Sequence, residues 1–469
     1  MAKPASGTFE ARYDQGVRLR RMTPREKHAD LHVPPHRDPV AILAAGDRTR
    51  VPELVPERYK RMLVSPFTFL RGAAAVMADD LQHEASAGIT VQACGDCHLM
   101  NFGAFVTPED QILFDINDFD ETLPGVDFTV DLKRLAASVA VAALDAGFSS
   151  KRARAAVAAT VEAYRVRMRA LAKLSPLEIW HSKMELTQEI KHIEDRELRR
   201  RLHAIITRAG RRPEQDDNFP HLAKGTKIAD KPPTIYHFKH EGDPRRRVEV
   251  DDVYTSYQKC LPPERRSLYE RYVRADTAFK AVGVGSVGTF CAISLFMSGD
   301  GHPMFLQFKE AQESVLECLG PKFDGHPGRR VVEGQRTMQA ASDIFLGWTE
   351  DPVSGRHFYV RQLKNRRLGS IGEIVEGQAF VNYASLCGRT LARAHARSGD
   401  PALMAGYMGK SDAFDDAVAS FAMAYAARTQ QDYNLLANSK ATGEGPGKGK
   451  VTQSERPKEK RKPPVAKRA

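Results

Sequence analysis

The feature that most constrains this chain is a stretch of acidic and amide side chains between residues 94 and 120. It reads Cys-Gly-Asp-Cys-His-Leu-Met-Asn-Phe-Gly and, after a short hinge, Gln-Ile-Leu-Phe-Asp-Ile-Asn-Asp-Phe-Asp. The apolar run at 112–114 predicts a strand, so oxygen ligands should gather at strand ends. Such groups suit Mg²⁺, which takes one or two carboxylates and leaves its other positions to water and phosphate oxygens. The candidate ligands form two clusters, first Asp96, His98 and Asn101, then Asp115, Asp118 and Asp120.

The two cysteines of this stretch permit other interpretations. Cys94-Gly-Asp-Cys-His matches the patterns of haem attachment and of Cys-x-x-Cys redox sites. Haem attachment would need an export signal, and a thioredoxin-like site would not have acidic metal ligands beside its cysteines. We therefore interpret Cys94 and Cys97 as small buried side chains that flank Asp96. An acidic loop capped by its own Asp residues is a further alternative.

Length and charge limit the class of protein to which this chain can belong. With 469 residues, 42% of them hydrophobic and 28% charged, the chain is long enough for two or three globular domains. The formal charge is +11, but residues 439–469 alone hold ten Lys or Arg against three Glu. This Gly/Pro/Lys tail cannot bury a core and is expected to be disordered; it could contact anionic partners weakly or act only as a solvated tail.

No stretch has the pattern of a targeting or membrane-spanning segment. The N-terminus lacks the apolar region of a signal peptide, and the longest apolar run, residues 135–144, is too short to cross a bilayer. Six scattered cysteines form no secreted framework. We expect a cytoplasmic protein without a membrane span.

Around the acidic stretch, helical patterns dominate. Residues 1–60 form a charged, Pro-rich arm, and Ser65-Pro66 is a helix start whose Arg71 could reach a phosphate or be structural. Asp131 stands where the N-cap of a long apolar helix belongs. Amphipathic helices are expected over 152–174 and 185–209, followed by a long polar loop at 210–235.

From residue 282 the pattern changes to strands and turns. The run Gly283-Val-Gly285-Ser286-Val-Gly288 is followed by a strand and not by a helix, which excludes a dinucleotide fingerprint. The run fits a Gly-rich hairpin over phosphates instead. Lys309 follows in an apolar strand, where it could pair with nucleotide phosphates or merely solubilise an edge strand.

Two further segments complete the expected nucleotide site. Residues 329–345 predict a helix, and its Glu333 could pair with the strand lysine, as Glu313 or Glu317 could. The strand that begins at residue 357 ends near Gln362 and Leu363, which in a kinase-like fold would meet the adenine. Helices are expected again at 377–397 and 412–436.

These motifs resemble an uncharacterised bacterial family, the domain of unknown function numbered 2252. The resemblance covers most of the chain, through Ser65-Pro-Phe-Thr-Phe-Leu-Arg-Gly, Gly95-Asp-Cys-His-Leu-Met-Asn-Phe-Gly, Asn117-Asp-Phe-Asp-Glu, Leu306-Gln-Phe-Lys-Glu-Ala and Leu391-Ala-Arg-Ala-His-Ala-Arg-Ser-Gly-Asp. It implies no activity.

The acidic stretch is also similar to the aminoglycoside phosphotransferase and choline kinase group, with its His-Gly-Asp-x-His-x-x-Asn loop, strand, Ile-Asp-Phe and Asp-Leu. This resemblance implies Asp96 as the base or orienter of an acceptor hydroxyl, within a catalytic loop that includes His98. It implies Asn101 and Asp118 as Mg²⁺ ligands, while Asp115 and Asp120 remain candidates. Cys94 stands where the group often has His, which leaves the packing of the loop open.

In that group the Gly-rich hairpin and its lysine precede the catalytic loop, whereas here they follow it. The resemblance therefore implies an α+β, protein kinase-like two-lobe fold that is circularly permuted, with a mainly helical large lobe and a small antiparallel-sheet lobe; surface termini tolerate such a permutation. The expected parts are an arm (1–60), a large-lobe part with the catalytic and metal loops (61–275), the small nucleotide-binding lobe (276–370), a helical completion (371–437) and the tail (438–469).

The expected function is ATP·Mg²⁺-dependent phosphoryl transfer to an unknown hydroxyl-bearing small molecule or protein. The helical 150–270 region is expected to hold the acceptor, and its basic residues suggest an anionic one. Two alternatives stay open: transfer of AMP with the nucleotide reversed, and a binding module that senses nucleotides without turnover.

Overall fold

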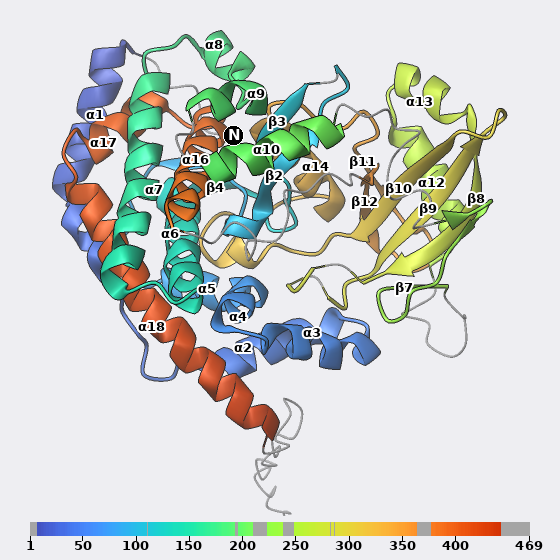
Figure 1. The fold of residues 1–469 in the computed structure, drawn as a ribbon, viewed down its shortest axis with the longest axis horizontal. Helices are drawn as coiled ribbons and strands as arrows, with labels where there is room; N and C mark the ends of the chain where they lie inside the picture. The colour runs from blue at the N-terminus through green and yellow to red at the C-terminus, as the bar shows by residue number, and fades with distance from the viewer. Residues whose placement is uncertain are drawn as a thin grey trace, which may run out of the picture.

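The computed structural model describes residues 7–109, 111–192, 196–209, 223–237, 248–281, 283–285, 287–363 and 377–441. Helices and antiparallel strands occupy separate parts of the molecule, which confirms the expected α+β class. Figure 1 shows the long helices on the left and the largest sheet on the right, with several short helices below them. The three parts meet around the acidic stretch described above.

The helical part is built around four long helices, α6 (Phe128–Asp145), α7 (Ser150–Leu171), α16 (Gln378–Ala396) and α18 (Ala413–Ala441), and α7 packs against the other three. Sixteen residues of α6 are buried, and each buried Leu or Val contributes about 1.5–3 kcal/mol. Asp127 caps this helix by accepting from Thr129 N at 2.9 Å. The expected cap, Asp131, instead lies inside the helix and is fully buried.

The N-terminal helix α1 (Phe9–Met22) lies along α17 (Pro401–Met408), near the other end of the chain. The two backbones approach closely because Gly16 and Gly406 face the partner helix. A Cβ on Gly406 would lie 2.0 Å from Tyr13 O, and one on Gly16 would lie 2.1 Å from Leu403 O. Residues from both ends of the described chain therefore complete one helical part, as Figure 1 shows.

The largest sheet has six antiparallel strands in the order β11-β12-β10-β9-β8-β7. Their bounds are β7 (Ile235–Tyr236), β8 (Tyr272–Lys280), β9 (Cys291–Ser298), β10 (Pro303–Glu310), β11 (Gly347–Glu350) and β12 (His357–Gln362). The helices α12 (Val250–Cys260), which is followed by α13 (Pro263–Tyr269), and α14 (Pro327–Met338) pack against β11, and α14 also packs against β12. The Gly-rich run connects β8 to β9, and Lys309 lies on the central strand β10, so the expected hairpin and lysine strand are present.

Two small strand pairs lie between this sheet and the helices. β1 (Thr90–Ala93) pairs with β4 (Leu123–Asp127), and β2 (Phe102–Val106) pairs with β3 (Ile112–Ile116). The Asp96 loop joins β1 to β2, and the loop with Asp118 and Asp120 joins β3 to β4. Pairing therefore brings both acidic clusters to one end of these strands.

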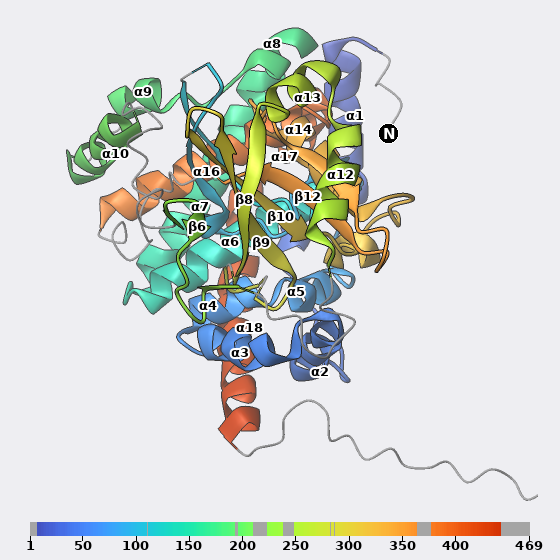
Figure 2. The same ribbon diagram turned by 90° about the vertical axis from the view of Figure 1, so that its right-hand side faces the viewer.

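Four short helices lie below the strands and close the molecule there (Figures 1 and 2). They are α2 (Pro39–Gly46), α3 (Val55–Met62), α4 (Pro66–Gly72) and α5 (Ala74–Leu81). Ser65 caps α4 with a capping box, as its sequence predicts. Residues 1–60 are thus less of an arm than expected, because α1 and α2 pack against the body of the protein.

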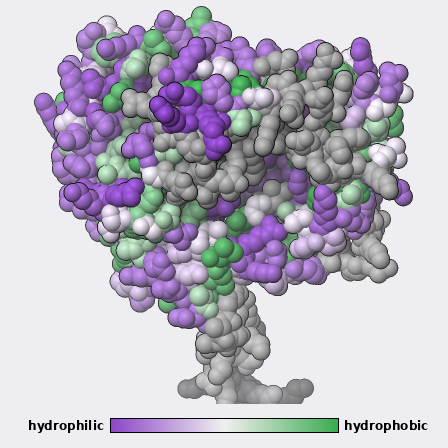
Figure 3. Space-filling model, viewed as in Figure 1, coloured by the Kyte–Doolittle hydropathy of each residue, from purple (hydrophilic) through white to green (hydrophobic). Residues whose placement is uncertain are grey.

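The remaining elements are short or peripheral: α8 (Pro176–His181), α9 (Leu186–Glu189), α10 (Arg196–Ala209), and the pair β5 (Ala223–Lys224) and β6 (Lys227–Ile228). This pair lies within the expected 210–235 loop, most of whose first half falls outside the described residues. The expected tail begins inside α18, and residues 442–469 lie outside the described residues. Within the described ranges, no helix combines the length and apolar character needed to cross a membrane. Where Figure 3 colours the surface, hydrophilic residues predominate and hydrophobic ones form small separate groups.

Candidate functional site

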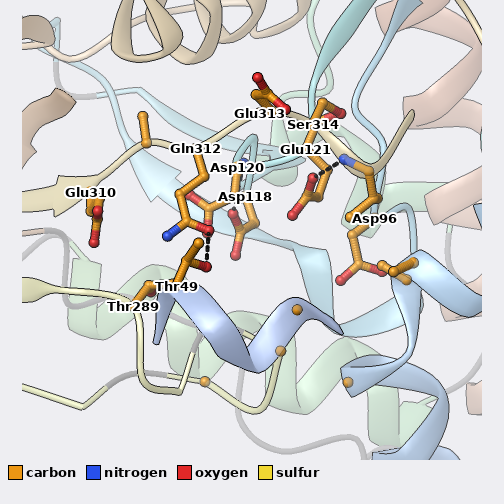
Figure 4. A pocket seen from close by; sticks show the side chains of 18 of the residues that line it. Thr49, Asp96, Asp118, Asp120, Glu121, Thr289, Glu310, Gln312, Glu313 and Ser314 are labelled. Carbon is orange, nitrogen blue, oxygen red and sulfur yellow. Dashed lines mark hydrogen bonds between the residues drawn. The ribbon is translucent and has the colours of Figure 1, made fainter. Parts of the chain in front are cut away.

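A cavity of about 860 Å³ lies where the strand pairs, the large sheet and the short N-terminal helices meet. Figure 4 shows Asp96, Asp118 and Asp120 facing this space. The Asp96 loop, the β3–β4 loop, the Gly-rich loop and the end of β10 all contribute to its lining. The volume is within the range of small-molecule sites, roughly 300–1,000 Å³.

The Asp96 loop is fixed from behind by the buried Asp131. The carboxylate of Asp131 accepts hydrogen bonds from Cys94 N at 2.7 Å and Gly95 N at 3.0 Å, and His395 Nε2 lies 3.1 Å from it. Gly95 has φ of 96°, and a Cβ there would lie 2.4 Å from Glu121 O. Only glycine fits this turn, which holds the two acidic loops together. The residue expected to cap a helix thus positions the loop.

Asp96 extends from this loop into the cavity. Its Oδ1 accepts from Arg134 Nε at 3.0 Å and Nη2 at 2.8 Å, while Oδ2 lies 3.6 Å from His98 Nε2. Burial raises the pKa of Asp96, and Arg134 opposes that rise. Arg134 therefore orients the carboxylate through one oxygen, while the other oxygen lies beside His98.

Asn101 lies at the end of the same loop and also lines the cavity. Its side-chain amide donates to Asp96 O, and its own carbonyl accepts from Asn117 N at 2.8 Å. These bonds join the first acidic cluster to the start of the second. Asn101 and Asp118, the pair expected to hold a metal, line one cavity.

The second cluster divides into two roles. Asp118 and Asp120 line the cavity, and Asp118 Oδ1 accepts from Asp120 N at 3.2 Å. Burial and the neighbouring Asp120 raise the pKa of Asp118. Burial also acts on Asp120, but Lys309 and Tyr359 outweigh it and lower its pKa overall. Of the two carboxylates, Asp118 is therefore the one less compensated by nearby positive charge.

Asp115 is not part of the cavity, contrary to its candidate role as a metal ligand. It is 1% exposed, pairs with the fully buried Arg393, and accepts from Ala340 N at 2.9 Å. Its strand position turns the side chain away from the loop that follows β3. Asp115 therefore joins α16 to the strands and has no free oxygen to offer a ligand in the cavity.

Lys309 is 3% exposed and lines the cavity from β10. Its Nζ donates to Asp120 Oδ2, and Tyr359 Oη donates to Asp120 Oδ1 at 2.7 Å. Burial favours the neutral amine, yet Asp120, Tyr359 and Asp118 raise the pKa of Lys309 overall. The lysine is thus a charged side chain of the site and not a solubilising group at a sheet edge.

Glu333 is not the partner of Lys309. It pairs with Arg329 at 2.7 Å on the exposed side of α14, because the two residues are one helical turn apart. Glu313 and Glu317 line the cavity but are not bonded to the lysine in the described residues. Sequence spacing along α14 could not show which of its faces would turn toward β10.

The expected adenine contacts, Gln362 and Leu363, do not line the cavity. Gln362 N donates to the Asp343 carboxylate, and Leu363 N donates to Phe305 O at 2.9 Å. Gln362 is the last residue of β12, and Leu363 follows it, directly before a stretch that lies outside the described residues.

The Gly-rich loop contributes Gly283 and Gly285 to the cavity. Gly283 and Gly288 have φ of 74° and 93°, and a Cβ on Gly285 would lie 3.0 Å from Arg71 O. Glycine is therefore needed for both the turn and the close approach. Gly288 is not among the lining residues, and Ser286 lies outside the described residues.

Several lining residues escaped the analysis of the sequence. Glu121 follows Asp120 and accepts from Val315 N at 2.8 Å, and burial raises its pKa to about 7. Arg330 of α14 donates to Asp120 O and Gln312 O, each at 2.8 Å. Arg50 and Arg58 reach the cavity from the N-terminal side. Only Glu121, adjacent to the acidic motif, offered a local signal.

The acceptor region expected at residues 150–270 contributes none of the described lining residues. Helices α2, α4 and α5 occupy that wall instead, through Ile42, Leu43, Arg71, Ala74 and Ala75. α7 packs against α6, α16 and α18 instead, and α10 contacts α9.

Comparison with known proteins identifies one family. Its model, described as "Uncharacterized protein conserved in bacteria (DUF2252)", matches residues 50–439. No curated protein and no solved structure matches the chain.

Proposed function

The chain belongs to this DUF2252 family, whose description names no activity, and from the residues of the site we propose that it is an ATP·Mg²⁺-dependent phosphotransferase. The observation that carries the proposal is the meeting of three groups in one cavity. A buried lysine (Lys309), a metal-type pair (Asn101 and Asp118) and an oriented carboxylate (Asp96) line it together. Phosphoryl transfer requires these groups and little other chemistry from a protein.

The donor set fits a magnesium ion. Asn101 and Asp118 offer hard oxygen atoms, and the raised pKa of Asp118 reflects a buried charge that a cation would stabilise. Bound there, Mg²⁺ would neutralise phosphate oxygens and orient the nucleotide. Asp120 is engaged by Lys309 and Tyr359 and is the weaker candidate ligand.

In the proposed reaction the acceptor hydroxyl lies against Asp96. Its oxygen forms a bond to the terminal phosphorus of ATP, the bond from that phosphorus to the bridging oxygen breaks, and ADP leaves. Asp96 takes the hydroxyl proton, and Arg134 keeps the carboxylate aimed through its two hydrogen bonds of 3.0 and 2.8 Å. Backbone groups of Gly283 and Gly285 line the phosphate side of the cavity. Most of the rate enhancement would come from positioning and electrostatics.

A permuted kinase-like fold is part of the proposal. A sheet with a Gly-rich β8–β9 connection, a lysine on the next strand and a helix packed behind it is followed by α16, and the Asp96 loop comes from the N-terminal half. In space these parts would form a small lobe and a large lobe with the site between them. The N-terminal helix α1 packs against α17, from the C-terminal part of the chain, which is compatible with a permutation.

The test is ligand-induced stabilisation of the full chain by ATP with MgCl₂. A ligand at one hundred times its Kd adds about 2.7 kcal/mol to the free energy of unfolding. We expect an increase in Tm that needs both ATP and Mg²⁺ and that Asp118→Asn removes. Glu333→Gln is the matched control, since this carboxylate lies outside the cavity and should leave the increase intact.

Absence of any nucleotide-dependent increase in the wild type would refute the proposal. Product analysis separates the alternatives that share this site. Release of ADP supports phosphoryl transfer, release of pyrophosphate indicates AMP transfer, and binding without product across an acceptor screen indicates a sensing module.

A further inference from the structure

The N-terminal wall of the cavity, formed by residues 39–75, is bonded to the Gly-rich loop. Val51 N donates to Gly288 O at 2.7 Å, and Arg50 Nη1 donates to Val287 O at 2.6 Å. Thr49 Oγ1 lies 3.0 Å from Gln312 Oε1, beyond the end of β10. These bonds hold the N-terminal wall against the Gly-rich loop and the segment after β10. An acceptor that reaches Asp96 must fit within about 860 Å³ together with the phosphates of the nucleotide.

Positive charge exceeds negative charge on this wall around Asp47. Arg50 and Arg58 both line the cavity and share one carboxylate, Asp47. Arg58 Nη1 lies 2.8 Å from Asp47 Oδ1, and Tyr59 Oη donates to Asp47 Oδ2 at 2.5 Å. Arg50 Nε is farther away, at 3.6 Å from Asp47 Oδ1. Asp47 is therefore largely used by Arg58 and Tyr59. Two guanidinium groups thus share one carboxylate, and Arg50 is the more distant of the two.

Arg50 is the arginine that is paired less closely with Asp47. Its side chain is 13% exposed, and its Nε is enclosed without a hydrogen-bond partner among the described residues. Burial, reinforced by Arg58, lowers its pKa to about 10. Arg50 Nη1 is bonded to Val287 O, but a buried cation with an unsatisfied donor costs free energy that a bound anion would recover. A guanidinium also matches the two oxygens of a phosphate or carboxylate.

Acidic residues elsewhere on the lining restrict where such an anion could sit. In Figure 4, Glu313 lies above the other labelled acidic side chains, Glu121 lies between Asp120 and Asp96, and Thr49 lies below them. Asp96, Asp118 and Asp120 occupy the middle of the view. An anion beside those carboxylates would need the metal, whereas one beside Arg50 would not.

We propose that Arg50 binds the anionic group of a small acceptor, so that the substrate of this site is a hydroxyl-bearing molecule with a phosphate or carboxylate group. The proposal rests on the proposed function and adds the acceptor class to it. The same guanidinium could instead serve the terminal phosphate of the nucleotide, since the chemistry is shared. The experiment separates these two sources.

Glycerol 3-phosphate is the probe, because it combines a hydroxyl with a phosphate, and glycerol is its neutral control. Binding to the full chain is measured by calorimetry with saturating ADP and MgCl₂, so that the nucleotide region is filled. We expect glycerol 3-phosphate to bind and glycerol not to bind. Arg50→Gln should weaken the phosphate-bearing probe at least tenfold. Arg48→Gln is the matched control, an exposed arginine two residues away that does not line the cavity.

A second arm measures ATP with MgCl₂ on the same variants. Loss of ATP affinity in Arg50→Gln with unchanged affinity for the probe would overturn the proposal and assign Arg50 to the nucleotide. Equal affinity of wild type and Arg50→Gln for the probe, or no probe binding at all, would also overturn it. If Arg50→Gln does not fold, Arg50→Lys keeps the charge but loses the two-pronged contact, and a several-fold weaker probe affinity is then expected.

Failure of the proposed function would look different. Inorganic phosphate is tested without nucleotide. If phosphate binding depends on Arg50 but ATP has no effect on the protein, the anion site is supported and the proposed phosphotransferase function is refuted. If phosphate does not bind but ATP has a Mg²⁺-dependent effect, the phosphotransferase proposal is supported and the proposal of an anionic acceptor is refuted.

Discussion

Lys309 forms an ion pair with Asp120, a residue 189 positions earlier in the chain. The lysine side chain is 4% exposed and that of the aspartate 23%. This contact joins the central strand of the large sheet to the loop after β3. It is one of several direct links between the half of the chain that carries the acidic motif and the half that carries the Gly-rich loop.

Breaking this pair from one side should destabilise the protein. Lys309→Met leaves Asp120 with only Tyr359 as a side-chain donor, and removal of one partner of a buried pair costs roughly 3–5 kcal/mol. Because Asp120 is partly exposed, we expect about 3 kcal/mol, measured by urea unfolding. The double variant Lys309→Met/Asp120→Asn should recover part of that loss. Equal stabilities of wild type and Lys309→Met would mean that the ion pair does not form in solution.

Asp115 and Asp118 are three residues apart and should respond oppositely to the same substitution. Asp115→Asn leaves Arg393, which is fully buried, without its charged partner, so a loss of about 3–5 kcal/mol in unfolding free energy is expected. Asp118→Asn removes a carboxylate that burial already disfavours and should change stability little. The increase in Tm caused by ATP and Mg²⁺ should persist in Asp115→Asn and be lost in Asp118→Asn. A large loss of stability in Asp118→Asn alone would contradict this division of roles.

The two acidic clusters, the hairpin and the lysine strand could be predicted from the sequence because each is a local pattern. Strand pairing then had to bring them together, and β1–β4 and β2–β3 do so. Local patterns could not predict which of three neighbouring aspartates would turn inward. Asp115 is in β3 itself, where alternate side chains face opposite sides, whereas Asp118 and Asp120 follow the strand.

Other parts of the site depend on tertiary contacts without a local signal. Arg50 and Arg58 lie in a charged N-terminal segment that resembles a solvated arm, and only contacts such as Val51 N with Gly288 O show it to be a wall of the cavity. Glu333, Glu313 and Glu317 were the candidate partners of Lys309, but Asp120 of the β3–β4 loop is the carboxylate that pairs with it. The function of Asp131 was missed because an Asp near a helix start usually caps it.

Glu121 should make stability depend on pH. Burial raises its pKa from 4.5 to about 7, so the folded state binds the proton more tightly than the unfolded state. The resulting stabilisation is complete below about pH 4.5 and is lost as the pH rises through 7. Glu121→Gln can keep the bond from Val315 N and cannot titrate. Its stability relative to wild type should therefore increase from pH 5 to pH 8 in urea unfolding; a constant difference would rule out the shift.

Lys133 of α6 is a buried cation in the helical part that does not line the cavity. It is 1% exposed, its Nζ has no hydrogen-bond partner among the described residues, and it lies 4.6 Å from the centre of the Phe421 ring. Burial lowers its pKa from 10.5 to about 8. The unfolded state thus binds more protons between pH 8 and pH 10.5, and stability should rise with pH across that range.

Lys133→Met tests whether this charge costs stability. A shift of this size corresponds to about 3 kcal/mol at neutral pH, and the contact with the Phe421 ring offsets about 2 kcal/mol of it. Methionine fills a similar volume, so we expect the variant to gain about 1 kcal/mol at pH 7 and to lose that advantage by pH 10. Lys151→Met, at an exposed position at the start of α7, should change nothing. Destabilisation of Lys133→Met at every pH would show that the cation–ring contact outweighs the cost of burying the charge.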